Sequence, residues 1–146
     1  MESEQFVKER VKRYYWDDDI NCATTALKIL SEKFNIALTD QIVNAAIGLH
    51  GAGEYGAQCG LVEGTLMFLG IIGRSMGAPD QEIVKHCNDF ASAFENRFSS
   101  LLCRVLRPQG FNDANPPHLC EGLTCEAIDF NIAFVEKFLQ PYCQRI

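Results

Sequence analysis

Apolar residues recur along most of this chain at the three- and four-residue spacing of an α-helix. No segment shows the sustained alternation of apolar and polar residues that a half-buried strand requires. The pattern therefore predicts an all-α fold. The six expected helices span about residues 3–15, 22–34, 41–49, 57–76, 81–106 and, from a start at either 119 or 124, up to 140.

Two of these segments define the expected core. The segment 57–76 is apolar nearly all round, so we expect it to be the central helix. Gly60 and Gly64, four residues apart in it, would let a neighbouring backbone come close. The segment 81–106 carries one apolar stripe, Ile83, Cys87, Phe90, Phe94, Phe98, Leu101 and Val105. No repeat or linker divides the chain, so we expect residues 1–146 to form a single compact bundle of about six helices with an apolar central helix.

Composition narrows the classes of partner. The net charge is −6, whereas a nucleic-acid-binding protein needs a basic face, so we expect no nucleic-acid partner. The charged first sixteen residues do not resemble a cleavable leader, and no apolar stretch reaches the roughly 20 residues that cross a bilayer. We therefore expect a cytoplasmic protein without a membrane partner. Apolar residues on two sides of the last helix suggest a homodimer.

The cysteine content points to a chemistry. The chain holds seven cysteines, and structural disulfides are rare in a reducing compartment, so we expect metal binding or thiol redox chemistry. No C-x-x-C pair, haem-attachment motif or ferredoxin run is present. Any site must therefore be assembled by the fold from cysteines that are distant in the sequence.

Helix position separates the cysteines into two groups. Cys22 and Cys59 fall in the first turns of predicted helices, and Cys120 lies at or just before the start of the last one. A helix N-terminus stabilises a thiolate, so we expect lowered thiol pKa values there. Cys103 points away from the apolar stripe of the segment 81–106, so it faces either a second packing surface or a site. Cys87 lies on the stripe and is expected to fill the core.

Two further residues are candidates beside these thiols. Glu63 lies one turn beyond Cys59 and could accept a proton or ligate a metal, or it could instead reach solvent or pair with a basic residue on another helix. His118 lies two residues before Cys120 and could supply a non-sulfur metal ligand, or it could instead be an ordinary surface histidine.

Four motifs together resemble a known family. They are Asn21-Cys22-Ala23, the glycine-rich stretch from Gly51 through Cys59-Gly60 to Gly64, the segment from Phe98 through Cys103-Arg104 to Leu106, and His118-Leu119-Cys120. This pattern resembles the C_GCAxxG_C_C family, whose name describes redox-active proteins, over residues 20–140. The resemblance implies that the functional cysteines are Cys22, Cys59, Cys103 and Cys120. Leu61 and Glu63 depart from the family pattern, and Cys125 is an addition to it.

Three functions follow from these observations. The four thiols could bind an iron–sulfur cluster or another thiophilic metal for electron transfer with a redox partner of unknown identity. Two of the four could instead form a reversible disulfide in a metal-free oxidoreductase or redox sensor, which needs a pair with Cα atoms closer than about 7 Å. The third function is a structural helical domain that acts through protein–protein contacts.

Overall fold

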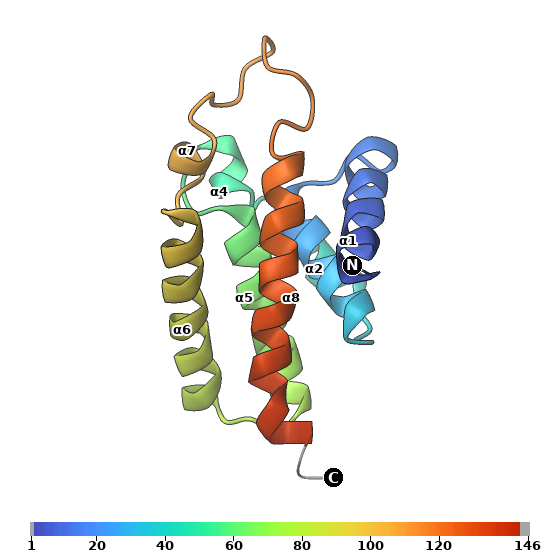
Figure 1. Ribbon diagram of the computed structural model, residues 1–146, viewed down its shortest axis with the longest axis vertical. Coiled ribbons are helices and arrows are strands. Elements are labelled where there is room, and N and C mark those ends of the chain that lie inside the picture. The colour runs from blue at the N-terminus through green and yellow to red at the C-terminus, as the bar shows by residue number, and fades with distance from the viewer. Residues whose placement is uncertain (1, 144–146) are drawn as a thin grey trace.

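The computed structural model describes residues 2–143 and confirms the all-α prediction (Figure 1). Within these residues the chain forms eight α-helices, with a π-helical turn, η1, after the first. In order they are α1 (Glu2–Lys12), η1 (Arg13–Asp17), α2 (Cys22–Lys33), α3 (Asp40–Ala45), α4 (Gly51–Glu54), α5 (Gly60–Ser75), α6 (Asp80–Phe98), α7 (Cys103–Leu106) and α8 (Glu121–Cys143). None of the helices in the described residues is long and apolar enough to cross a membrane.

Helix α5 is the central helix, as its composition predicts. It packs against α2, α6 and α8, and most residues of its first two turns are buried, among them Leu61, Val62 and Thr65. The fully buried Phe68 and Leu69 lie at its middle. Because three helices surround α5, their ends are held relative to one another at the end of the bundle where α4 and α7 also lie (Figure 1).

Aromatic rings fill the space between α6 and α8. Phe90 lies edge-on to Phe134 at 5.2 Å between ring centroids, and Phe98 lies edge-on to Phe130 at 5.6 Å. Buried aromatic rings contribute large apolar areas and favour such edge-to-face geometry. The apolar stripe predicted for the segment 81–106 therefore packs against α8 as far as Phe98.

The helix predicted over 81–106 is wrong beyond Phe98. Ser99 adopts a left-handed conformation, with φ 78°, and ends α6. The next residues are extended, and Gln58 and Leu102 form an isolated antiparallel β-bridge. The periodicity continues through Leu101 and Val105, but the chain has turned, and α7 is a separate short helix that begins at Cys103.

Other predicted boundaries also differ. The third helix ends at Ala45 and is followed by turns, and the central helix begins at Gly60 rather than at 57. Pro141 was expected to end the last helix, but α8 continues to Cys143. Tyr142 is buried, packs on Phe138 of the same helix at 5.5 Å between ring centroids, and donates a hydrogen bond to Glu82 of α6, so a tertiary contact holds this final turn.

Residues 51–54 form a left-handed turn. Gly51, Ala52, Gly53 and Glu54 have φ values of 64°, 55°, 65° and 70°. Non-glycine residues pay about 1–2 kcal/mol each for this conformation. Contacts elsewhere in the fold must offset this cost, and the turn, with His50 and Glu54, forms part of the wall of the site described next.

Candidate functional site

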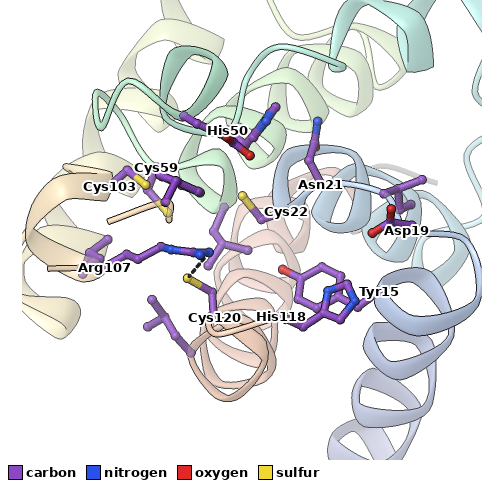
Figure 2. Close-up of a pocket in the computed structure, with 16 residues that line it drawn as sticks. Tyr15, Asp19, Asn21, Cys22, His50, Cys59, Cys103, Arg107, His118 and Cys120 are labelled. Carbon is purple, nitrogen blue, oxygen red and sulfur yellow. Dashed lines mark hydrogen bonds between the residues drawn. The ribbon is translucent and has the colours of Figure 1, made fainter. Parts of the chain in front are cut away.

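The four cysteines at the helix starts line one cavity of about 350 Å³ at the α4–α7 end of the bundle (Figure 2). The remaining lining residues come from the loops and helix ends around them. They are Tyr15, Asp19, Ile20, Asn21, His50, Glu54, Leu61, Leu106, Arg107, Phe111, His118 and Leu123.

Each of the four cysteines lies at a helix N-terminus. Cys22 is the first residue of α2, Cys59 is the N-cap of α5, Cys103 begins α7, and Cys120 directly precedes α8. The predicted placement is confirmed for Cys22 and Cys120 and is one residue outside the helix for Cys59. Sequence reasoning missed that Cys103 also lies at a helix start, because it placed Cys103 within a longer helix.

Gly60 and Gly64 allow the start of α2, which carries Cys22, to pack closely against the start of α5, which follows Cys59. A Cβ atom added at Gly60 would lie closer than 3.0 Å to Cys22 Sγ and 2.9 Å from the Ala23 nitrogen. A Cβ at Gly64 would collide with the Ala23 backbone. The close approach predicted for these glycines is therefore the contact of α5 with the start of α2, and it sets Cys22 beside Cys59.

The β-bridge places Cys59 and Cys103 on a common wall. The Cys59 nitrogen donates to the Leu101 oxygen at 2.8 Å, and the Cys103 nitrogen donates to the Ala57 oxygen at 2.7 Å. Cys59 and Cys103 flank the Gln58–Leu102 bridge as diagonal neighbours on one face of it. Gly51 supports this wall, because a Cβ there would lie 3.1 Å from Cys103 Sγ.

The fourth wall is the loop that leads into α8. Arg107 Nη1 lies 3.9 Å from Cys120 Sγ and donates a hydrogen bond to it (Figure 2). The His118 ring stacks on Tyr15 at 5.3 Å between centroids and meets Trp16 edge-on at 4.5 Å. Tyr15 is 4% exposed and its hydroxyl pairs with Thr124 Oγ1 at 2.7 Å. These contacts hold the residues around Cys120 against η1 and α8.

The thiols of Cys22, Cys59 and Cys103 are protonated at neutral pH in the free protein. Burial raises the pKa of Cys59 to about 12, and burial together with the nearby Cys59 raises the pKa of Cys22 further. The pKa of Cys103 is also raised, again mainly by burial. The lowered pKa values expected for Cys22 and Cys59 are therefore wrong. Backbone N–H groups at the helix starts do lower the pKa values of Cys22 and Cys59, but desolvation is the larger effect.

The other candidates divide between the cavity and its surroundings. His118 lines the cavity, whereas Glu63 does not. The Glu63 side chain forms a hydrogen bond with Gln58, and burial raises the pKa of its carboxyl group. Cys87, Cys125 and Cys143 lie outside the lining. All seven cysteines fall within residues 2–143 and all are free. Across those residues, no group of three or more His, Cys, Asp or Glu side chains already has the geometry of a metal site.

Sequence reasoning missed Tyr15 and Arg107. His50 was one of three histidines, with His86 and His118, that could supply a non-sulfur ligand or lie at the surface. A signal existed for His50, because it directly precedes the glycine-rich stretch. None existed for Tyr15, which reaches the cavity from a π-helical turn that no local pattern predicts.

Comparison with known proteins agrees with the cysteine geometry. The family described as "Putative redox-active protein (C_GCAxxG_C_C)" matches residues 20–134 of the 146-residue chain. No curated protein and no solved structure matched the chain. The match covers all four cavity cysteines, and the chain belongs to the C_GCAxxG_C_C family of redox-active proteins.

Proposed function

We propose that this protein binds an iron–sulfur cluster, or another polynuclear thiophilic metal centre, through Cys22, Cys59, Cys103 and Cys120, and that it transfers electrons. The observation that carries the proposal is the convergence of four thiols from four helix starts on one cavity. When bound, such a centre would supply a one-electron redox couple.

The donor set fits such a centre. Thiolates are the ligands that iron–sulfur clusters require, and four cysteines are the number that a cubane or a rhombic cluster uses. Four helix N-termini offer partial positive charge to the anionic thiolates, and Arg107 adds a full positive charge beside Cys120. These groups would compensate the negative charge that the buried thiols gain when they lose their protons to a metal.

The size of the cavity favours a polynuclear centre over a single ion. In a Cys₄ zinc site the sulfurs lie about 3.8 Å apart, since each Zn–S bond is about 2.3 Å. A cavity of about 350 Å³ gives far more room than four sulfurs in that arrangement enclose. We therefore rank a cluster before zinc.

A thiol–disulfide function is the second candidate, and one observation favours it. All four cavity cysteines are free, and Cys59 and Cys103 share one face of the β-bridge. Diagonal neighbours across such a bridge have Cα atoms about 7–8 Å apart, slightly beyond the reach of a disulfide. This pair would need a backbone movement to oxidise, so we rank the disulfide function second.

Anaerobic purification tests the proposal. The wild-type protein should be brown, should contain stoichiometric iron and acid-labile sulfide, and should lose its visible absorption on reduction by dithionite. Serine variants of Cys22, Cys59, Cys103 and Cys120 should each lose most of the iron. The matched controls are Cys87→Ser, Cys125→Ser and Cys143→Ser, which should retain it because these residues lie outside the cavity lining.

Two outcomes would contradict the proposal. A colourless, metal-free protein that gains two titratable thiols on reduction would support the disulfide function instead. A metal-free protein whose thiols neither bind iron during anaerobic reconstitution nor oxidise would leave only a structural domain.

A further inference from the structure

The cavity contains an imidazole whose role the four thiols do not explain. His50 lines the cavity, and its Nδ1 atom is buried and has no hydrogen-bond partner within residues 2–143 (Figure 2). A buried polar atom without a partner costs about 1–3 kcal/mol, and folded proteins rarely keep one without a reason. Thr25 Oγ1, Asp129 Oδ1 and Asn131 Oδ1 are also buried without a partner in the described residues, but none of these residues lines the cavity. The unpaired nitrogen of His50 is therefore the one that belongs to the site.

The backbone of His50 runs between two of the thiols. On one side, the Leu49 oxygen lies next to Gly60, since it would be 3.1 Å from a Cβ atom added there. Cys22 Sγ would crowd the same added atom, so Leu49 and Cys22 both lie beside Gly60. On the other side, Gly51 packs directly against the Cβ and Sγ atoms of Cys103. The imidazole is thus attached at the point where the Cys22 and Cys103 walls of the cavity meet.

The segment that carries His50 is fixed from both ends. Asn21 Nδ2 donates to the Ile47 oxygen at 2.8 Å and to the Ala46 oxygen at 3.2 Å, which ties the segment to the start of α2. The Glu54 nitrogen donates to the His50 oxygen at 3.0 Å within the left-handed turn. These hydrogen bonds fix the backbone on both sides of His50, and with it the position from which the imidazole extends.

We infer that His50 is a hydrogen-bond donor to the sulfur of the bound centre, through its Nδ1–H group. This inference rests on the proposed function and deepens it, because it assigns control of the reduction potential to a residue that is not a ligand. Hydrogen bonds to cluster or ligand sulfur stabilise the more negative, reduced state and raise the potential. His50 is accordingly a positioning and tuning residue of the site.

The test compares three variants with the wild-type protein. His50→Leu removes the donor and keeps much of the volume, whereas His50→Asn keeps an N–H donor close to the position of Nδ1. The control is His86→Leu, since His86 packs edge-on against Phe138 and does not line the cavity. Each protein is titrated anaerobically with dithionite and redox mediators, and the visible spectrum gives the reduction potential.

We expect His50→Leu to bind stoichiometric iron and to show about a tenfold smaller ratio of reduced to oxidised centre at a fixed potential. That change corresponds to a potential about 59 mV lower for a one-electron couple. His50→Asn should recover most of the shift, and His86→Leu should show none. The metal-free His50→Leu protein should unfold at an equal or higher urea concentration than the wild type, because it no longer buries an unpaired nitrogen.

Three results would overturn the inference. One is an unchanged potential in an iron-loaded His50→Leu protein, and another is an equal shift in His86→Leu. The third is a clearly lower unfolding midpoint of metal-free His50→Leu, which would make His50 an ordinary structural residue. Wild-type protein without iron would overturn the proposed function first and the inference with it, so the two failures are distinguishable.

Discussion

Gly60 sets the distance between the start of α2 and α5, and with it the position of Cys22. A Cβ atom there has no space beside Cys22 Sγ and the Ala23 nitrogen. We predict that Gly60→Ala lowers the free energy of unfolding by about 1–3 kcal/mol, the usual cost of overpacking, and also lowers the iron content. Urea denaturation and iron analysis measure the two effects.

Gly70 is the matched control for this prediction. It lies in the same helix, and a Cβ atom there would have nothing within 4 Å. Gly70→Ala should therefore raise the free energy of unfolding by about 0.5–1 kcal/mol, because alanine loses less backbone entropy than glycine in a helix. Equal effects of the two substitutions would contradict the role given to Gly60.

The raised thiol pKa values predict a loss of stability at alkaline pH. An unfolded thiol has a pKa of about 8.5, whereas that of Cys59 is about 12 in the fold. The folded state thus holds its proton in a pH range where the unfolded state has lost it. The stabilising contribution is fully present below pH 8.5 and falls as pH rises from there toward 12, by up to about 1.4 kcal/mol per pH unit for each such thiol.

Urea denaturation of the reduced, metal-free protein at pH 8 and pH 10 measures this loss. Cys59→Ser should show a smaller loss than the wild type, since serine does not titrate in this range. Cys143→Ser should behave as the wild type because Cys143 is exposed. A wild-type stability that is flat between the two pH values would disprove the pKa assignment.

At the residue scale, the sequence singled out the four thiols that line the cavity but missed most of the polar residues around them. Cys22, Cys59 and Cys120 were identified by their position at helix starts, which depends on local signals such as the Asn21 cap. Tyr15 and Arg107 reach the cavity through tertiary packing, which no local pattern encodes. Cys103 was singled out because it points away from the apolar stripe of a longer predicted helix, but that helix ends at Phe98 and Cys103 begins a new one.

At the scale of elements, the break at Ser99 matters most for the site. It turns the chain so that Cys103 begins a new helix and pairs beside Cys59. Serine gives little sequence signal for a left-handed residue, and the apolar spacing continues through the break. The same limitation applies to Ala52 and Glu54 in the left-handed turn, whereas the long, apolar α5 was predicted as the central helix, although it begins at Gly60 rather than at 57.

The conformation of Ser99 makes a prediction of its own. Ser99 is exposed at φ 78°, so Ser99→Gly should raise the free energy of unfolding by about 0.5–1 kcal/mol by relieving left-handed strain. The control is Ser92→Gly, at an exposed position inside α6, which should lower it by about as much. Thermal unfolding of both variants checks the sign, and a destabilised Ser99→Gly protein would rule out the strain.

At the scale of the whole molecule, occupation of the cavity should stabilise every helix that lines it. A ligand that binds only the folded state adds about 4 kcal/mol when its free concentration is 1,000 times its dissociation constant. We predict that the iron-loaded protein unfolds at a higher denaturant concentration than protein stripped by chelator under anaerobic conditions. The Cys103→Ser protein should show no difference between the two preparations, and an equal difference in that variant would show that the gain has another source.

The order of the cysteines along the chain has a consequence for biosynthesis. Cys22, Cys59 and Cys103 are all translated before Cys120, which lies only one residue ahead of the final long helix. Domains generally fold from the N-terminus during synthesis, so a nascent chain can bring three thiols together while the fourth is still missing. Under the proposed function, complete assembly of the centre must therefore wait until Cys120 has been translated, and an incorporated centre would mark a chain whose synthesis has passed the entry to α8.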